Sequence, residues 1–377
     1  MQKLEPEIQA FAHIKVVGVG GAGGNAVNHM INSRVRGVEF IVMNTDVQDL
    51  HKIPARKKIH LGKNLTRGLG AGMNPDIGKN AAEETKSEVQ DMLKGADMVF
   101  IAAGFGGGTG TGGSPVIARI AKEIGALTVA VVTKPFFFEG ARRMQIAESG
   151  LEELRNEVDA LIIIPNDRLL GIIGKDVTAS GAFAMSDDVL RQAVEGISDL
   201  ITTTGLINVD FADIRAVMAN AGSALMGVGK AIGEKRAVEA AKNAINSPLL
   251  DISINGAKGV LFAIAGGDDI TMFEIQEAAK IITESIDKDA KVIFGAIKDH
   301  KLKKGELMVT VIASGFSENA RTKPLWGGHV GKKTDLNVNE KKERTEEFEN
   351  KIEKNKNDDD DWDAIVPAFL RRGKEKK

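Results

Sequence analysis

The sequence predicts an α/β protein: a parallel sheet covered by helices on both faces, then one long helix and a smaller α+β part. Mostly apolar runs alternate with amphipathic stretches over the first 165 residues. Strands without a polar face are typical of parallel sheets that helices cover on both sides. The same region is rich in glycine, with 38 of the chain's 42 glycines before residue 317, which indicates many tight turns.

The elements of the first part follow in chain order. Each expected strand is a short apolar run bounded by turn residues, and each expected helix is an amphipathic stretch. Ser114 and Pro115 are residue types that open a helix, as the N-cap and the first helical residue. The expected strands are Ile14–Val19, Glu39–Met43, Met98–Ala103, Thr128–Thr133 and Leu161–Ile164, and the expected helices are Gly24–Ile31, Ser114–Ile124 and Arg142–Val158.

The long helix is predicted by apolar residues that recur near every 3.6 positions between Val189 and Ile201. The threonines Thr202–Thr204 and then Gly205 end it. The last two strands beyond it resemble edge strands, so this part should hold a mixed sheet. The expected elements are helices at Asp213–Met226 and Ile270–Ile286, and strands at Gly259–Ala265, Lys291–Ile297 and Leu307–Ala313.

Five segments are predicted along the chain. They are an N-terminal domain at residues 1–178, the central helix at 179–204, a second domain at 205–316, a linker at 317–357 and a terminal peptide at 358–377. From residue 317 onward 29 of 61 residues are charged, against 27% in the whole chain, so ordering entropy should keep the linker disordered. The apolar run Ala364–Leu370 favours a docking peptide, with a frayed terminus as the alternative.

Composition excludes several classes of function. The chain has no cysteine, so it has no disulfide scaffold, thiolate nucleophile or iron–sulfur cluster. The net charge of −2 is unsuited to nucleic acid as the main partner. No apolar run reaches the roughly 18 residues of a membrane span, and the first residues do not predict a signal peptide. The six histidines are scattered, so we expect no metal site built by the protein alone.

The first glycine-rich segment predicts a phosphate-binding turn. It runs from Gly18 to Asn25 as GVGGAGGN, after a strand and before a helix, and contains the spacing G-x-G-x-x-G. Glycine lets the backbone approach a phosphate, and a helix N-terminus supplies free N–H donors. Asp46, about 20 positions on, completes a dinucleotide fingerprint. NAD binding, another phosphate ligand and a bare turn all remain open from this segment alone.

The second glycine-rich segment, Gly104–Gly113, has seven glycines in ten residues after another predicted strand. We expect these seven glycines to have no packing role, and they predict a loop of free N–H groups with two threonine hydroxyls beside them. No lysine follows, so this is not a Walker loop. Two such loops on neighbouring strands suit a triphosphate better than a pyrophosphate.

A third motif combines an amide with two carboxylates: Asn208, Asp210 and Asp213. Asp213 could simply cap the helix that follows. The three groups could also polarise and position a water for attack on a phosphoryl group.

These segments together resemble the FtsZ proteins, the prokaryotic relatives of tubulin. Gly106–Gly112 reads GGGTGTG, which matches the tubulin/FtsZ signature loop letter for letter. The resemblance covers roughly residues 10–316 and the terminal peptide. Further segments that match in family order are Asn44–Asp46, Leu65–Gly72, Phe138–Gly140, Ile164–Leu169 and Asn208–Asp213.

The resemblance implies a GTPase with a Rossmann-like GTP-binding domain, and it implies a role for each matching residue. Thr109 would lie near the terminal phosphate, Gly70–Gly72 would sense the γ-phosphate, and Phe183 would stack on the base. Residues implied for GTP binding are Gly20, Gly21, Ala22, Gly23, Gly24, Asn25, Ala71, Gly72, Gly107, Gly108, Thr109, Gly110, Glu139, Arg143, Asn166, Phe183 and Asp187. Without the family, Arg143 could form a surface ion pair, Phe183 could belong to the core, and Asp187 could cap the long helix.

The resemblance also implies head-to-tail polymerisation. Asn208, Asp210 and Asp213 would complete the active site of the next subunit, so assembly would switch on hydrolysis. Mg²⁺ should arrive with the GTP or GDP. The peptide Asp363–Arg372 would dock on membrane-anchoring and regulatory division proteins, which places the chain in the cytoplasm at the division site. The alternatives are a non-polymerising tubulin-family regulator and an NAD-dependent oxidoreductase.

Overall fold

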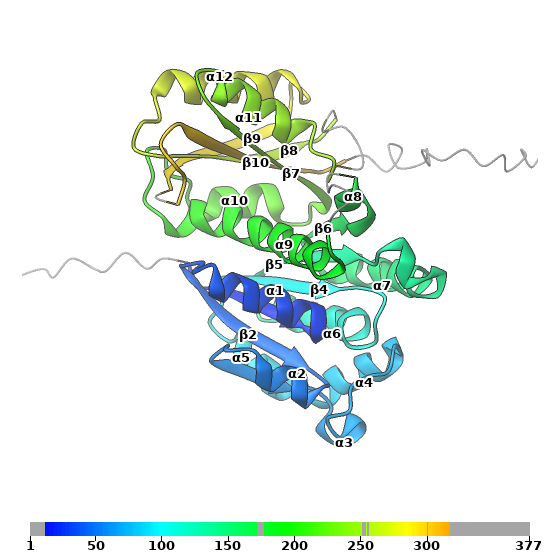
Figure 1. Cartoon of the computed structure of the whole chain (residues 1–377). Coiled ribbons are helices and arrows are strands. Elements are labelled where there is room, and N and C mark those ends of the chain that lie inside the picture. Colours follow the sequence, from blue (N-terminus) through cyan, green and yellow to red (C-terminus); the bar gives the residue numbers. More distant parts are fainter. Residues whose placement is uncertain (1–11, 172–176, 251–253, 255, 300, 317–377) are drawn as a thin grey trace, which may run out of the picture. The chain divides into compact units, whose positions relative to one another are not determined.

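A computed structural model describes residues 12–171, 177–250, 254, 256–299 and 301–316 (Figure 1). The predicted linker at 317–357 and the terminal peptide at 358–377 lie outside the described residues. The division of residues 1–316 into two domains and a central helix stays a prediction.

The strands of the first part form the parallel sheet that the sequence predicts. Every neighbouring pair from β3 to β6 is parallel, in the order β3-β2-β1-β4-β5-β6. Their bounds are β1 Ile14–Val19, β2 Val38–Asn44, β3 Lys57–His60, β4 Met98–Gly104, β5 Leu127–Lys134 and β6 Ala160–Pro165.

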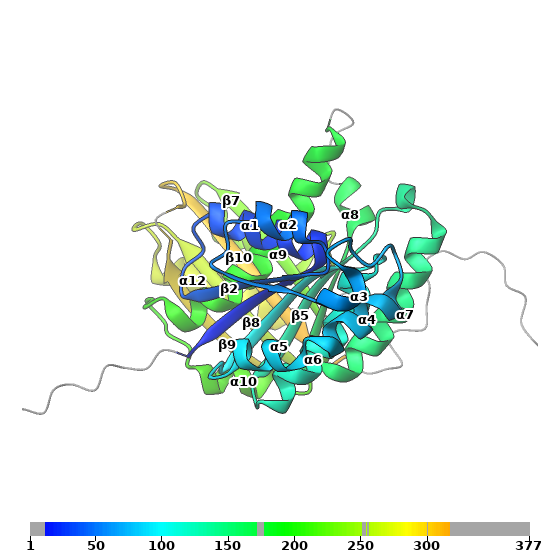
Figure 2. The same ribbon diagram turned by 90° about the horizontal axis from the view of Figure 1, so that it is seen from below.

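Helices cover both faces of this sheet (Figure 2). Along β1, Ile14 and Val16 pack into one apolar cluster with α1 and α9, whereas Val17 and Val19 pack into a second cluster with α4, α5, α6 and α7. Both faces of the strand are therefore apolar, which explains its unbroken apolar run. The helices of this part are α1 Gly20–Asn32, α2 Val47–Lys52, α3 Lys63–Thr66, α4 Pro75–Glu84, α5 Lys86–Leu93, α6 Thr109–Glu123, η1 Phe137–Glu139, α7 Ala141–Glu157, α8 Asn166–Leu170 and α9 Ala179–Thr202.

The second part extends the same sheet. The first residues of β7 pair in parallel with β6, and the order continues β7-β10-β8-β9. β10 is antiparallel to both β7 and β8, so the predicted mixed sheet is confirmed. Of the last two strands, β9 is at an edge of the sheet but β10 lies inside it, so the expectation that both resemble edge strands was wrong for β10. The bounds are α10 Phe211–Met218, β7 Gly222–Ile232, α11 Arg236–Ile245, β8 Gly259–Gly266, α12 Met272–Glu284, β9 Lys291–Lys298 and β10 Glu306–Ser314.

The expected helix at Asp213–Met226 was wrong in its second half. α10 ends at Met218, and β7 begins at Gly222. Asn220 and Gly222 have φ of +53° and +67°, left-handed values that a helix cannot continue through. An added Cβ on Gly227 of β7 would lie 2.1 Å from the carbonyl oxygen of Ala244, so α11 packs directly on this strand. The signal for this break was the pair Asn220 and Gly222.

Two helices begin earlier than expected. α6 starts at Thr109, inside the glycine-rich segment, and Pro115 lies within it instead of opening it after Ser114. α1 likewise begins at Gly20 and not at Gly24. Glycine lowers helix propensity, so its presence argued for a loop. Close packing overrides that preference in both helices, because Gly23 of α1 and Gly112 of α6 each lie against the backbone of a neighbouring element.

Candidate functional site

A cleft of about 640 Å³ opens at the carboxyl ends of the parallel strands β1, β4, β5 and β6, and the first turns of α9 form another wall. This edge is where open α/β sheets bind ligands, and the volume is in the range of small-molecule sites. Predicted residues that line the cleft are Gly20, Gly21, Ala22, Asn25, Gly107, Gly108, Thr109, Gly110, Glu139, Arg143, Asn166, Phe183 and Asp187.

The two glycine-rich segments meet at this cleft. A Cβ added to Gly20 would lie 3.0 Å from the backbone nitrogen of Gly110. Gly20 opens α1 and Gly110 lies in the first turn of α6, so two helix N-termini with unpaired N–H groups lie side by side. A Cβ on Gly107 would meet no atom within 4 Å, so it would enter the space of the cleft. This is the arrangement that an anionic phosphate group requires.

Some glycines of both segments serve packing instead, so the expectation that the glycines of the second segment have no packing role was wrong. A Cβ on Gly112 would lie 1.9 Å from the carbonyl oxygen of Pro75, so this glycine lets α4 approach α6. Gly23 does not line the cleft; its added Cβ would lie 2.2 Å from the carbonyl oxygen of Ala102 on β4. Gly24, also outside the lining, packs against Ile53.

The loop at Gly70–Gly72 lies beside the second glycine-rich segment, Gly104–Gly113, which we call the phosphate loop. Gly70 and Gly72 have φ of +84° and +56°, which glycine adopts without strain. Ala71 is buried, and a Cβ on Gly108 would be 2.7 Å from its methyl group. Ala71 and Gly72 do not themselves line the cleft, whereas the next residue, Met73, does.

The opposite end of the cleft combines an aromatic ring with polar side chains. Phe183 is 45% exposed and packs edge-on to Phe136, with ring centroids 5.3 Å apart, so it is not a core residue. The Asn166 Oδ1 accepts a hydrogen bond of 2.9 Å from Ser186. Burial raises the pKa of Asp187 to about 6, against a smaller lowering by His29. Asp187 lies well inside α9, whose cap is Thr178, so the alternative of a capping role was wrong.

Glu139, the last residue of η1, forms an ion pair with Arg143 in the first turn of α7, with Arg143 Nη1 2.6 Å from Glu139 Oε2. The other oxygen, Oε1, accepts a hydrogen bond of 3.0 Å from the backbone N–H of Phe136. Both residues line the cleft, so the ion pair and the ligand-facing position coexist. Sequence reasoning missed Asp49, Met73, Phe105, Thr133, Pro135, Ser186 and Leu190, which also line the cleft. Positions at the ends of β4 and β5 could have indicated Phe105, Thr133 and Pro135, whereas the others lie in or before helices and carry no such local signal.

The motif of Asn208, Asp210 and Asp213 lies away from the cleft, and all three side chains are exposed. Asp210 Oδ1, and not Asp213, caps α10 by accepting from the backbone N–H of Asp213 at 2.8 Å. Asn208 Oδ1 accepts from the backbone N–H of Gly205 at 2.7 Å. Within the described residues the Asp213 carboxylate has no hydrogen bond or ion pair.

α10 lies beside the amino ends of the parallel strands. Arg215 Nη2 on α10 donates to the carbonyl oxygen of Gly125, which precedes β5 (3.1 Å). A Cβ on Gly37, which precedes β2, would lie 2.3 Å from Thr202 Oγ1 at the end of α9. α9 therefore runs from the cleft at the carboxyl ends of the parallel strands to the carboxylate motif near their amino ends.

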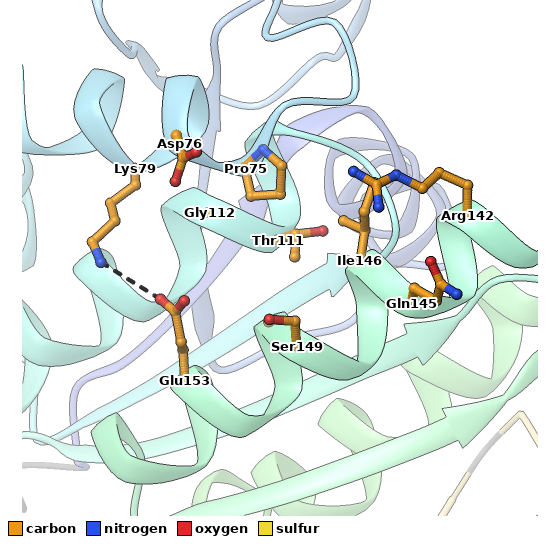
Figure 3. A pocket seen from close by; sticks show the side chains of 11 residues that line it. Pro75, Asp76, Lys79, Thr111, Gly112, Arg142, Gln145, Ile146, Ser149 and Glu153 are labelled. Atoms are coloured by element: carbon orange, nitrogen blue, oxygen red, sulfur yellow. Dashed lines mark ion pairs between the residues drawn. The ribbon is translucent and has the colours of Figure 1, made fainter. Parts of the chain in front are cut away.

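A second cavity, of about 270 Å³, lies between α4, α6 and α7 (Figure 3). The side chains of Lys79 and Glu153 point toward each other at one end of it, 3.6 Å apart, and Arg142 extends from the other end. Thr111, on its floor, accepts a hydrogen bond of 2.9 Å from the backbone N–H of Gly106. The cavity thus lies directly behind the phosphate loop.

Comparison with known proteins identifies the family. The model of the tubulin/FtsZ family GTPase domain matches residues 13–174, and that of the FtsZ family C-terminal domain matches residues 222–317. FtsZ from M. jannaschii, solved as an empty dimer, is 46% identical, with 83% of this chain and 93% of that chain covered and a TM-score of 0.79. The chain belongs to the FtsZ family.

Other solved structures agree with this assignment. A single-substitution variant of the M. jannaschii FtsZ is 47% identical, with 82% of this chain and 92% of that chain covered and a TM-score of 0.79. The GTPγS-bound protofilament of CetZ2 from Haloferax volcanii is 23% identical, covers 90% of this chain and 99% of that chain, and has a TM-score of 0.68. The CetZ2 likeness shows the shared fold alone.

As a member of the FtsZ family the chain is a GTPase. The dinucleotide alternative loses its acidic residue, because Asp46 caps α2 through bonds to the backbone N–H groups of Gln48 (2.8 Å) and Asp49 (3.2 Å) and does not line the cleft. No group of three or more His, Asp or Glu side chains in the described part of the chain could hold a metal ion. None of the helices there is long and apolar enough to cross a membrane.

Proposed function

We propose that this GTPase polymerises head to tail and that each subunit completes the active site of its neighbour. One observation carries the proposal: the cleft lies at the carboxyl ends of the parallel strands, and the carboxylate motif lies near their amino ends. From Asp187 in the cleft to Thr202 at the far end, α9 rises 15 residues, or about 22 Å at 1.5 Å per residue. Asp210 and Asp213 therefore cannot reach a nucleotide in their own cleft, whereas those of a second copy can.

Each side of the cleft has a proposed role toward GTP. The first turns of α1 and α6, with Gly107 and Gly108, hold the phosphates through backbone N–H groups. Glu139 and Arg143 reach the ribose and neighbouring groups. Phe183 stacks on the base, and Asn166 and Asp187 contact the guanine and ribose. An ionised carboxylate suits guanine because it accepts from the N1–H and N2–H₂ groups, an edge that adenine lacks.

The carboxylate motif supplies the chemistry of hydrolysis. Phosphoryl transfer depends mostly on positioning and charge, so the residues need only orient a water in line with the γ-phosphate. Asp213, whose carboxylate is free in the described structure, accepts a proton of that water, and Asp210 and Asn208 fix the loop through their bonds to backbone N–H groups. Mg²⁺ that arrives with the nucleotide neutralises phosphate charge.

The cellular role follows from these parts. Dynamic filaments that weaken after hydrolysis form the cell division ring at the inner face of the cell membrane. Support comes from the M. jannaschii FtsZ, which was solved as a dimer. The peptide Asp363–Arg372 would attach the filament to membrane-anchoring and regulatory division proteins. Removal of residues 358–377 should leave GTP turnover intact and abolish the mid-cell band of a fluorescent fusion; a band that persists would contradict the docking role.

The test measures light scattering and phosphate release with Mg²⁺ and either GTP or GDP. We expect scattering to rise with GTP only and to decay as GTP is consumed, and turnover per subunit to rise with protein concentration. Asp213→Ala should bind GTP normally and lose most turnover, whereas Asp91→Ala, an exposed carboxylate on α5, should behave as the wild type. GTP binding without assembly at any concentration would favour the regulator. Turnover that Asp213→Ala leaves unchanged would refute the catalytic role.

A further inference from the structure

The side chain of Thr45 lies beneath the phosphate loop without lining the cleft. Thr45 follows β2 and is fully buried. Its Oγ1 lies 2.6 Å from the Oγ1 of Thr109, the first residue of α6, which is only 9% exposed and lines the cleft. A buried hydroxyl requires a hydrogen-bond partner, and Thr109 is the partner of Thr45. The contact spans 64 positions in the sequence, so tertiary structure alone creates it.

The direction of this hydrogen bond depends on what occupies the cleft. Each hydroxyl has one proton and can accept as well as donate, so either threonine can be the donor. A phosphate oxygen can only accept. When a phosphate faces Thr109, the Thr109 hydroxyl donates its hydrogen bond to a phosphate oxygen. The Thr45 hydroxyl then becomes the donor to Thr109. The resulting chain of two hydroxyls strengthens the bond to the phosphate, because consecutive hydrogen bonds polarise one another.

The backbone of Thr45 also holds the neighbouring loop. Its carbonyl oxygen accepts from the backbone N–H of Gly70 at 3.2 Å and from the Oγ1 of Thr66 at 3.3 Å. One residue therefore connects Thr109 with the loop Gly70–Gly72. A change limited to the side chain of Thr45 would remove only the bond to Thr109 and leave these backbone bonds in place.

We propose that Thr45 is a positioning residue that orients the hydroxyl of Thr109 toward the terminal phosphate of GTP. This rests on the proposed nucleotide site. Thr45 touches no ligand itself and acts through Thr109. Because GDP lacks the γ-phosphate, Thr45 should contribute to the preference for GTP over GDP more than to nucleotide affinity in general.

The experiment compares the affinities of GTP and GDP, in the presence of Mg²⁺, for Thr45→Val and Thr45→Ser. Valine keeps the shape and removes the hydroxyl, and serine keeps the hydroxyl. We expect Thr45→Val to weaken GTP binding about tenfold and GDP binding less than about twofold, since a bond to a charged group is affected. Thr45→Ser should restore the GTP affinity. Thr128→Val removes another fully buried hydroxyl, at the start of β5, and should change neither affinity.

A double substitution shows whether Thr45 acts through Thr109. If it does, Thr45→Val should add nothing to the loss of GTP affinity caused by Thr109→Val. Additive effects, an equal loss of GTP and GDP affinity, or a Thr45→Ser variant as weak as Thr45→Val would overturn the proposal. If Thr45→Val fails to fold by circular dichroism, Thr45→Ala takes its place with the same expectations. A wild type that binds neither nucleotide would instead refute the proposed nucleotide site.

Discussion

Single glycines of the signature loop have two separate tasks that the letters GGGTGTG do not distinguish. Gly107 borders open space in the cleft, whereas Gly112 touches the backbone of Pro75 on α4. The sequence placed both in one expected loop of free N–H groups and assigned phosphate binding to Gly107. Only the packing of α4 against α6 separates a residue that leaves room for a ligand from one that leaves room for a helix.

Alanine substitutions at these two positions should therefore affect different properties, GTP binding at Gly107 and stability at Gly112. Gly107→Ala should unfold at the wild-type temperature and bind GTP at least about tenfold more weakly, because its methyl group enters the phosphate space. Gly112→Ala should lower the free energy of unfolding by about 1–3 kcal/mol, because its methyl group would overlap Pro75. Thermal unfolding and nucleotide titration check both. Equal effects of the two substitutions would contradict this division.

Asp187 is the residue whose ionisation should control GTP binding. Burial raises its pKa to about 6, and under the proposed function it is the ionised form that accepts from guanine. GTP affinity should therefore fall as the pH drops below about 6 and stay level above it. Isothermal titration from pH 5 to 8 measures this. Asp187→Asn removes the titrating carboxyl, so the pH dependence of its GTP affinity reports only the titration of the nucleotide's own phosphates and other groups. If the wild type and Asp187→Asn show the same pH dependence of GTP affinity, Asp187 does not control binding.

The same substitution should stabilise the nucleotide-free protein. A carboxyl with a raised pKa binds its proton more tightly in the folded state, so stability falls as the pH rises from about 4 to about 6. The difference between 3.8 and about 6 corresponds to roughly 2–3 kcal/mol. Asp187→Asn should recover much of this at pH 7, and chemical denaturation measures it. A less stable variant would show that Asp187 has a structural task.

At the scale of elements, a buried arginine links α11 to α12 beside the apolar cluster of the second part. Arg236, at the start of α11, is 5% exposed. Its guanidinium contacts Glu274 on α12 (2.5 and 3.0 Å) and Asp269 before α12 (2.8 Å). The hydrogen bonds from Arg236 hold the pKa of Glu274 and that of Asp269 below their ordinary values. The cluster joins two helices that cover the sheet at β7, β8 and β10.

Removal of Arg236 should destabilise this part strongly. Arg236→Ala leaves two carboxylates without their partner and close to each other, so the free energy of unfolding should fall. Because both carboxyl pKa values are lowered in the folded state, the stability they contribute is present above about pH 4.5 and is lost as the pH falls below it. Urea denaturation at pH 7 and pH 4 measures both effects. The loss caused by Arg236→Ala should shrink at the lower pH; an equal loss at both would contradict the role of charge.

At the scale of the whole molecule, α9 sets the distance between the cleft and the carboxylate motif. If one active site needs two subunits, two variants that are each inactive at a GTP concentration too low to fill the Gly107→Ala cleft should restore activity when mixed. Gly107→Ala has an intact carboxylate motif and a blocked cleft, and Asp213→Ala has the reverse. Where an Asp213→Ala subunit supplies the cleft and a Gly107→Ala subunit supplies the carboxylate motif, the shared active site has both parts intact.

Phosphate release from an equal mixture should therefore exceed the sum of the separate variants severalfold, up to about a quarter of the wild-type rate if the subunits pair at random. A mixture of Asp210→Ala with Asp213→Ala serves as the control, because both lack the motif, and it should stay inactive. If the first mixture is no more active than its components, hydrolysis does not require a shared site.

The sequence by itself determined the fold class, the family and most of the cleft. Apolar strands, the long periodic helix and the loop Gly106–Gly112 carry local signals, because periodicity and glycine chemistry act over a few residues. Tertiary structure decided what local signals leave open: that α10 stops for β7, that Gly23 and Gly112 serve packing, and that Asp210 is the cap. It also brought Thr45 against Thr109. These are contacts between distant segments, and their energies depend on which backbones approach each other, which no local pattern encodes.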